Sequence, residues 1–401
     1  MNLVSCLKGR TTLIALFLFG FSVLANAQEA QEPDKISEEK GAELSFIHRC
    51  MALADRMASL PDKLAYENEN IKITPIPLLA YSPSTGFKYG VYSVAVLGHK
   101  DSETATVVTP RFSFSTKQQM GAKVGLDLFM GDSYVLNSEL VAEKYPDEFY
   151  GIGNEAFDDP LDFTKEWVVL NADVLRRLKG DTWAGLSSHL LATKISEIQN
   201  VEDGSVDNPL FKNGRASFIG IGPVFRIDKR ENRYAPKSGY FLETKGLLYK
   251  RFDKDVNPFG IVKLDYRHYF SWGNGNNVMA FQMLGEGLVN AENTPFYLYP
   301  KIGGEDRLRG TGHENRYADE RFMFVRSEYR KHLFSRFGMV AFAGIGHHGA
   351  GSEWDSENFR HTVGLGGRFY LSEKERINLR IDIGTDLKGE KAIYFSLKEA
   401  F

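Results

Sequence analysis

The feature that most constrains the fold is a period of two in hydrophobicity, which runs through residues 72–401. In "IVKLDYRHYF", for example, Val262 and Leu264 lie on one face of an extended chain, opposite Lys263 and Asp265. Such a strand buries its apolar face either in the core of a soluble sandwich or in the lipid around a membrane barrel. Each strand alone fits both architectures, so the number of strands and the loops between them must decide.

Roughly sixteen such segments follow one another, each about nine to fourteen residues long, which is the length of a tilted strand that crosses a bilayer. They lie at 72–80, 87–98, 105–116, 120–129, 134–143, 164–177, 183–195, 216–228, 240–249, 259–270, 277–289, 321–333, 337–348, 360–371, 377–385 and 392–401. An even number of antiparallel strands places both ends on one side of a membrane, as in single-chain outer-membrane barrels.

The loop lengths favour the membrane barrel. If the first strand runs outward, the extracellular loops include the long connections 144–163, 196–215, 290–320 and 349–359. The tightest turns fall mostly on the other side, although "DKRENRYAPKSG" is a long exception there and "PSTG" is a short external loop. Long loops outside and short turns inside are typical of such barrels. The sequence therefore predicts an all-β fold, a transmembrane antiparallel β-barrel of about sixteen strands over residues 72–401.

The average composition is compatible with this fold. Mean hydropathy is −0.30, yet aromatic residues make up 13% of the chain, and 38 glycines stand against 14 prolines. An average this polar is expected where lipid-facing and lumen-facing residues alternate along each strand. A large periplasmic β-protein is the alternative that composition alone leaves open.

The first 27 residues have the form of a signal peptide, since Lys8 and Arg10 accompany a short apolar run that ends in "ANA". An uncleaved anchor is the alternative, but the run is short for a spanning helix. Cleavage changes the net charge from −3 to −5, which argues against a nucleic-acid partner. It also leaves Cys50 as the one cysteine, so the mature chain has no intrachain disulfide and no cysteine zinc site.

Residues 28–71 are predicted to form an N-terminal periplasmic segment ahead of the barrel. In "GAELSFIHRCMALADRMASL" the apolar residues fall near one helical stripe, which predicts a short amphipathic helix. This helix either packs on the barrel or lies at the membrane surface.

The loop "GGEDRLRGTGHENRYAD" carries the residues that suggest a family. Gly303, Gly304, Leu308, Arg309 and Gly310 resemble the "GG…(V/I/L)RG" motif of the BamA/TamA superfamily of outer-membrane assembly barrels, also called bacterial surface antigens. The segments "LLAYSPSTGFKYG", "FYGIGN", "DKRENRYAPKSGYFLE", "RSEYRKHL", "VGLGGRFYL" and "IYFSLKEAF" resemble family segments in the same order. The resemblance covers about residues 72 to 401 and implies a non-enzymatic barrel without cofactors. Only some forty-five residues precede the first strand, so a barrel without the family's POTRA domains is expected.

The resemblance also implies a site. In that family the sixth loop folds into the lumen, and its arginine pairs with acids on the inner wall. Glu328 matches the acidic position, so Arg309 is expected to pair with Glu328. Arg326 and Arg330 share the strand face of Glu328.

Two departures from the family pattern bear on this pair. Thr311 stands where the family has an aromatic residue after "RG", and Gly344 stands where an aspartate is typical. Asp265 and Asp382 are the alternative acidic partners for the loop arginine.

Two prolines in the first strand suggest a weak seam. Pro75 and Pro77 are two residues apart, so their missing N–H groups lie on one edge of the strand. That edge is predicted to face the sixteenth strand, which leaves the closing seam short of two hydrogen bonds, as a lateral gate requires. The alternative is that both prolines lie just below the bilayer, where water satisfies their neighbours.

The last strand ends in alternating apolar residues: Ile393, Phe395, Leu397 and Phe401. A terminal aromatic strand of this kind resembles the signal that the outer-membrane assembly machinery reads. Glu399 interrupts the apolar face near the interface, where charge is tolerated.

The function that follows is assistance in the insertion or translocation of outer-membrane proteins. Expected partners are outer-membrane lipids, the assembly machinery during the protein's own biogenesis, and unfolded outer-membrane proteins. A passive pore or surface antigen without insertase activity is the alternative, although mixed lumen charges favour a plugged lumen. The chain contains no "GxSxG" elbow and no Walker or Rossmann fingerprint, so the sequence points to no enzyme.

Overall fold

The computed structural model describes residues 63–98, 105–153, 159–198, 214–233, 235–350, 355–372 and 377–401. The predicted signal peptide and amphipathic helix lie outside these residues. The described chain is built almost wholly of antiparallel strands, as the sequence predicts. No helix in this part of the chain is long and apolar enough to cross a membrane.

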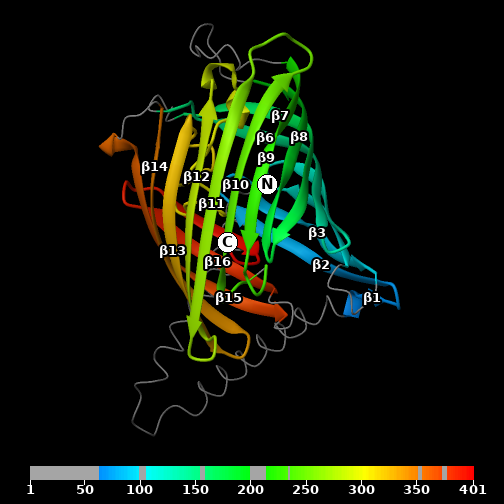
Figure 1. Ribbon diagram of the computed structural model, residues 1–401. Helices are drawn as coiled ribbons and strands as arrows, with labels where there is room; N and C mark the ends of the chain where they lie inside the picture. The colour runs from blue at the N-terminus through cyan, green and yellow to red at the C-terminus, as the bar shows by residue number, and fades with distance from the viewer. Residues whose placement is uncertain are drawn as a thin grey trace, which may run out of the picture. The chain divides into compact units, whose positions relative to one another are not determined.

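Sixteen strands, β2 to β17, close into a barrel in which neighbours in the chain are neighbours in the sheet and β17 returns to β2 (Figure 1). A two-residue strand, β1 (Tyr66–Glu67), pairs with β2. The sixteen strands are β2 (Ile71–Ser82), β3 (Gly86–Leu97), β4 (Thr106–Ser115), β5 (Met120–Met130), β6 (Tyr134–Phe149), β7 (Leu161–Lys179), β8 (Thr182–Ser196), β9 (Gly214–Asp228), β10 (Gly239–Arg251), β11 (Phe259–Trp272), β12 (Asn277–Val289), β13 (Arg321–Phe334), β14 (Phe337–Gly349), β15 (Phe359–Ser372), β16 (Ile377–Asp386) and β17 (Lys391–Leu397).

Most predicted strand ends lie within a few residues of the observed ends. Two strands differ by more. β6 continues to Phe149 because it pairs with β7 along its whole length, as far as Leu161. β17 stops at Leu397, four residues before the predicted end.

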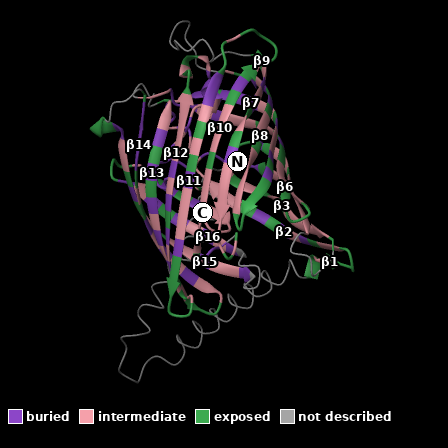
Figure 2. Cartoon of the chain, in the orientation of Figure 1, coloured by how far each residue is buried: buried purple, intermediate pink, exposed green. Residues whose placement is uncertain are grey.

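The barrel has its charges inside and its apolar residues outside. On β13, Arg326, Glu328 and Arg330 are buried in the lumen, whereas Met323 and Val325, on the other face, are 43% and 44% exposed. Figure 2 shows buried and exposed positions alternating along the strands. A soluble sandwich would have the opposite arrangement, because its apolar faces would meet in a core. The exposed apolar wall is the surface that lipid covers in a membrane barrel.

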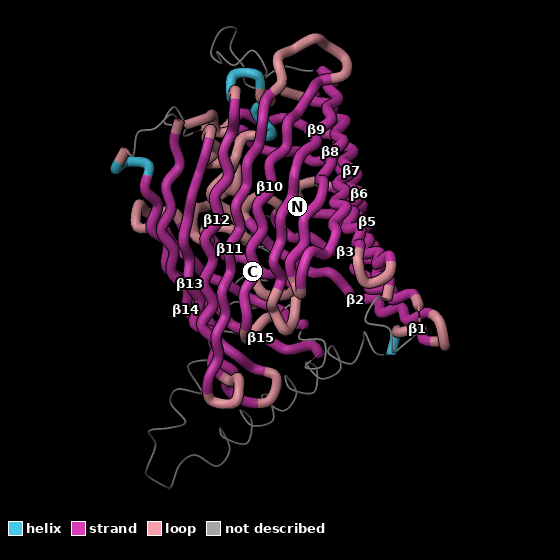
Figure 3. The backbone as a smooth tube through the Cα atoms, in the orientation of Figure 1, coloured by secondary structure: helices cyan, strands magenta, loops and turns pink. Residues whose placement is uncertain are grey.

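The two rims differ as the loop lengths predict. One rim carries tight turns, such as that between β11 and β12, where Gly273, Asn274 and Gly275 have positive φ values of 62°, 59° and 79°. The other rim carries the long connections and the 3-10 turns η1 (Ala291–Asn293), η2 (Phe296–Leu298) and η3 (Ser356–Asn358), as Figure 3 shows. The connection between β9 and β10 is long although it lies on the short-turn rim. The Glu231 carboxylate holds it by accepting hydrogen bonds from the backbone N–H groups of Lys237 and Ser238 at 2.7 and 3.0 Å.

If the outward face of β7 contacts lipid, the cost of an arginine there should depend on its depth in the bilayer. Leu170 lies near the middle of β7 and Leu178 near its end at the short-turn rim, and both have the outward parity of this strand. Leu170→Arg should destabilise the barrel in bilayers by about 2–4 kcal/mol, whereas Leu178→Arg should cost about 0–1 kcal/mol. Urea unfolding in liposomes, followed by heat-modifiable gel migration, measures both. Equal costs would contradict the assignment of this wall to lipid.

Candidate functional site

The candidate site is the loop between β12 and β13, which turns back into the barrel lumen. Leu308 is buried there with Ile302, and the two side chains join a cluster with Phe324 of β13. The loop is held in this fold by its own backbone, since the Leu308 N–H donates to the Ile302 carbonyl at 3.1 Å. The tip of the loop therefore lies against the inner wall rather than in solvent.

Arg309 is placed by this fold between two carboxylates. Its guanidinium donates to Glu328 of β13 and to Asp382 of β16, and it lies over the ring of Phe342 of β14, with 3.7 Å between the guanidinium carbon and the ring centroid. The Arg309 side chain is 1% exposed and both carboxylates are fully buried. One loop side chain thus bridges strands that lie on either side of β14 and β15.

Each carboxylate also holds a second arginine of the wall. The other oxygen of Glu328 accepts from Nε of Arg330 at 2.8 Å, and the other oxygen of Asp382 accepts from Arg368 of β15 at 2.6 Å. Arg380 of β16 also lies 3.7 Å from Asp382. Because two acids serve four arginines, all these charges depend on one another. Removal of one member leaves the others buried without a full set of partners.

The structure separates the two alternative acids. Asp382 contacts Arg309 together with Glu328. Asp265 does not, because it accepts instead from Arg267 at 2.7 Å and from Gln282 at 2.8 Å. The sequence pattern could not make this distinction, since both aspartates have inward parity and only their positions around the barrel differ.

The two departures from the family motif have a steric explanation. A Cβ at Gly344 would lie 2.6 Å from Cδ2 of Leu308, so this position leaves room for the loop and Asp382 supplies an acid from β16. Thr311 is fully buried, and its hydroxyl donates to the Leu308 carbonyl at 3.0 Å, which closes the turn.

The motif glycines lie where a side chain would collide with neighbouring atoms or where φ is positive. Gly310 has a φ of +107°, and a Cβ there would lie 2.6 Å from the backbone N of Thr385 on β16. Gly304 has a φ of +122°, and a Cβ at Gly303 would lie 2.3 Å from Oγ1 of Thr311. Larger residues at these positions are strained or displace the loop.

Acids on the loop face Arg380 of β16, which is 3.0 Å from Asp306 and 3.7 Å from Glu305. Enclosure by the barrel raises the pKa of Glu305 to about 7, and the adjacent Asp306 carboxylate contributes in the same direction.

The residues after β17 also enter the lumen, which corrects two expectations. The chain turns at Lys398, whose φ is +67°. Phe401 was expected on the strand face, but it is buried against Tyr269 inside the barrel. Glu399 was expected near the interface, but its carboxylate accepts from Arg368 at 2.8 Å and from Asn378 at 2.6 Å.

Arg326 and Arg330 hold this inward tail, residues 398–401, beside the loop. Arg326 donates to the Ala400 carbonyl at 3.2 Å and to the Asp306 carbonyl of the loop at 2.9 Å. Arg330 donates to the backbone oxygen of Phe401 at 3.0 Å. The loop and the tail are therefore fixed by the same strand, β13.

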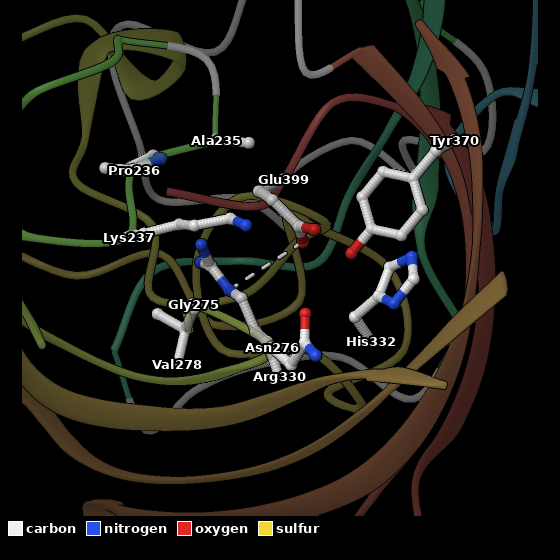
Figure 4. A pocket seen from close by; sticks show the side chains of 10 residues that line it. All are labelled: Ala235, Pro236, Lys237, Gly275, Asn276, Val278, Arg330, His332, Tyr370 and Glu399. Atoms are coloured by element: carbon white, nitrogen blue, oxygen red, sulfur yellow. Dashed lines mark ion pairs between the residues drawn. The ribbon is translucent and has the colours of Figure 1, made fainter. Parts of the chain in front are cut away.

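A cavity of about 410 Å³ lies beside the tail, between the β9–β10 connection, the β11–β12 turn and the inner wall (Figure 4). Arg330 and Glu399 form a 3.8 Å ion pair on its wall, and His332 and Tyr370 line it further along. Among the described residues, no group of three His, Cys, Asp or Glu side chains is arranged to hold a metal ion.

The seam between β17 and β2 is the second part of the site. Among the described residues, the pairing there is limited to Phe395 opposite Tyr81. The neighbouring junction of β17 with β16 is paired along its length, from Leu379 with Leu397 to Thr385 with Lys391. β17 is thus held firmly on one side only.

The prolines of β2 lie on the seam edge but below the end of β17. The Gly98 N–H donates to the Asn70 carbonyl at 2.9 Å, so even-numbered residues of β2 point their backbone groups at β3 and odd-numbered ones at the seam. The register of Phe395 with Tyr81 sets the end of β17 near residue 79, so Pro75 and Pro77 lie beyond its last residue. The seam is short because β17 is short, and the prolines remove two donors from the edge left uncovered.

Comparison with known proteins supports the fold. No protein-family model and no curated protein matches this sequence. Among solved structures, the BamA of Haemophilus ducreyi lacking POTRA domains 1–3 is similar with a TM-score of 0.59 and 11% identity, over 83% of this chain and 70% of that chain. CdiB from Acinetobacter baumannii and CdiB from Escherichia coli are similar with TM-scores of 0.52 and 0.53 and identities of 12% and 11%.

Each CdiB comparison covers 83% of this chain, which spans 60% of the Acinetobacter protein and 63% of the Escherichia protein. The chain therefore has the barrel fold of BamA and CdiB, which is that of Gram-negative outer-membrane barrels.

Removal of the loop arginine should release the loop. Arg309→Ala leaves Glu328 and Asp382 buried without it, at a cost of about 3–5 kcal/mol. Arg316→Ala is the matched control, because Arg316 lies in the same loop and pairs with Glu390 at 3.1 Å in a partly exposed position worth about 0–1 kcal/mol. Proteinase K cleavage between residues 290 and 320 should accelerate in the first variant and not in the second. Equal cleavage would show that the buried pair does not hold the loop.

A methyl group added at Gly346, where the loop packs on the inner wall, should also loosen the loop, without a change in charge. A Cβ at Gly346 would lie 2.6 Å from Cβ of Phe324 and 2.7 Å from Cδ1 of Ile302, whereas the nearest atom to a Cβ at Gly285 is 3.7 Å away. Gly346→Ala should therefore cost about 1–3 kcal/mol and loosen the loop, and Gly285→Ala should not. The same proteolysis assay decides, and a loop of unchanged resistance in Gly346→Ala would contradict this packing.

Proposed function

We propose that this barrel assists the insertion or translocation of other outer-membrane proteins through the seam between β17 and β2. The observation that carries the proposal is the pairing of Phe395 with Tyr81, which stands alone along the described part of this junction. Separation of the two strands breaks few backbone hydrogen bonds compared with any other junction of the barrel. The fold shared with BamA and CdiB supports the same role.

The uncovered edge of β2 gives the proposal a physical mechanism. Within the part of the chain that the structure describes, the backbone groups of β2 that point at the seam below residue 79 have no strand partner apart from the short pairing with β1. In lipid an unpaired backbone group costs several kcal/mol, so such an edge favours an added strand. An unfolded client strand can therefore add to this edge by donating to the Pro75 and Pro77 carbonyl groups. Once β17 separates, it can also pair with the seam-facing groups near Tyr81 that β17 has released.

The lumen contents argue against a passive pore. The loop seats Arg309 and Leu308 on the inner wall, and the tail brings Phe401 to the same strand. A conducting channel needs a continuous water-filled path through the lumen. The β12–β13 loop narrows that path from one end of the barrel, and the tail narrows it from the other. The passive-pore and surface-antigen alternatives are tested by the experiment below.

The proposal implies a location and partners. The chain is exported by a cleaved signal peptide and resides in the outer membrane of a Gram-negative cell. Its partners are the lipids around the apolar wall, the assembly machinery during its own folding, and unfolded outer-membrane proteins as clients. Its role is not enzymatic and needs no cofactor.

A cross-link at the seam should abolish the activity. Tyr81→Cys with Phe395→Cys, in a Cys50→Ser background, places two thiols directly opposite each other on the lipid side. Liposomes that carry the refolded chain should accelerate insertion of a small unfolded outer-membrane barrel, compared with liposomes that carry an unrelated barrel. Oxidation of the two cysteines to a disulfide should remove the acceleration, and reduction of the disulfide should restore it. The readout is the rate at which the client becomes resistant to protease.

The matched control joins two strands that stay paired. Ile383→Cys with Ile393→Cys ties β16 to β17 without closing the seam, and it should leave the acceleration unchanged. No acceleration by the wild-type chain would overturn the proposal. The conductance of the lumen would then decide between a pore and a surface antigen.

A further inference from the structure

The outer wall over β4 to β9 has a groove of about 710 Å³ below the long-loop rim, referred to here as the outer-wall groove. Its floor is formed by Ala122, Ala142, Val168 and Ala192. The strand register sets these residues side by side across four strands, because Ala122 lies opposite Ala142, Ala142 opposite Val168, and Val168 opposite Ala192. Small side chains in a row leave a shallow channel in the apolar wall.

One end of the groove is aromatic. Phe112 and Phe114 of β4 lie on the same outer face and are 55% and 48% exposed. Below the floor the wall is formed by larger outward residues such as Leu140 and Leu190. The floor is therefore an apolar recess, bounded on these sides by apolar residues, and its chemistry suits a lipid acyl chain.

A row of charges lies one step closer to the rim. The row consists of one residue from each of β6, β7, β8 and β9, and each is the register partner of the next: Lys144, Glu166, Lys194 and Arg215. The first three lie two residues along their strands from the floor residues. Arg215 lies two residues from Ser217, the register partner of Ala192. Two residues along a strand is about 6.6 Å, so the charges stand directly above the recess. Lys194 and Glu166 are 3.3 Å apart, which leaves the row with three cations against one acid.

The charged row marks the upper margin of the apolar belt. From this row down to Arg176 on β7, the outward residues of that strand are Val168, Leu170, Ala172 and Val174, none of which is charged. Arg176 marks the lower margin of the same wall. Basic side chains at the upper margin lie at the depth of lipid phosphates, where charge is tolerated and attracts anionic headgroups.

We propose that the outer-wall groove binds the lipid A part of lipopolysaccharide, with phosphates at Lys144, Lys194 and Arg215 and an acyl chain along the alanine floor. Lys144 and Arg215 lie three strands apart, or about 14 Å at the spacing of adjacent strands. This width suits a disaccharide with a phosphate at each end, whereas a phospholipid offers one phosphate. The long-loop rim faces the leaflet that contains this lipid if the barrel inserts as its loop lengths predict.

The test is a titration of the purified full chain with diphosphoryl lipid A, monophosphoryl lipid A or phosphatidylglycerol, followed by native mass spectrometry. The wild-type chain should bind diphosphoryl lipid A most tightly. Lys144→Glu combined with Arg215→Glu should weaken this binding at least about tenfold, since each basic residue near a membrane surface contributes about 1 kcal/mol. Ala142→Leu fills the floor without a change in charge and should also weaken binding.

Arg176→Glu is the matched control, because it reverses an outward basic residue at the other margin of the same wall. It should leave lipid A binding unchanged, and heat-modifiable migration shows that every variant is folded. Equal binding of monophosphoryl and diphosphoryl lipid A would overturn the two-phosphate assignment. Equal binding of phosphatidylglycerol, or binding that survives both the charge reversal and Ala142→Leu, would overturn the site.

Discussion

The structure depends on a buried arginine that reaches the barrel wall from a loop. Arg309 occupies a space between Glu328 and Asp382, over the ring of Phe342, where water is excluded. Without it Glu328 would keep Arg330 and Asp382 would keep Arg368, but both carboxylates would lose a partner in a medium of low dielectric. The loop is therefore not a flexible cover that happens to rest in the lumen. It completes the inner wall, and β13 and β16 are charged on their inner faces in a way that requires it.

The same set of charges determines the length of the last strand. Arg368 is shared between Asp382, which holds the loop, and Glu399, which lies in the tail. Arg326 donates to carbonyl groups of both segments. Residues that could have extended β17 are instead drawn inward, so β17 covers only part of β2. The electrostatics of the lumen and the weakness of the seam therefore have one origin, although they lie on different faces of the wall.

The strands and the difference between the rims could be predicted from sequence, because a period of two and the loop lengths are local properties of the chain. The end of β17 could not, because Ile393, Phe395 and Phe401 continue the same alternation past Lys398, and a lysine gives little sign of a left-handed turn. The choice of Asp382 over Asp265 could not be predicted either, because it depends on where β11 and β16 lie around the barrel. The alanine floor and the charged row had been invisible for a related reason, since each strand contributes one or two residues to them and only the register assembles them.

The two prolines of β2 also affect how one barrel meets another. An open strand edge in a membrane invites the matching edge of a second copy, and the two sheets can then fuse into one continuous ring. Pro75 and Pro77 cannot donate at two successive seam-facing positions, so a partner strand along that stretch would keep two unpaired carbonyl groups in lipid. A transient client that pairs and leaves tolerates this gap, whereas a permanent fusion of two barrels bears its cost indefinitely. The edge of β2 can therefore accept a client strand for a short time and still disfavour permanent pairing with a second copy of this barrel.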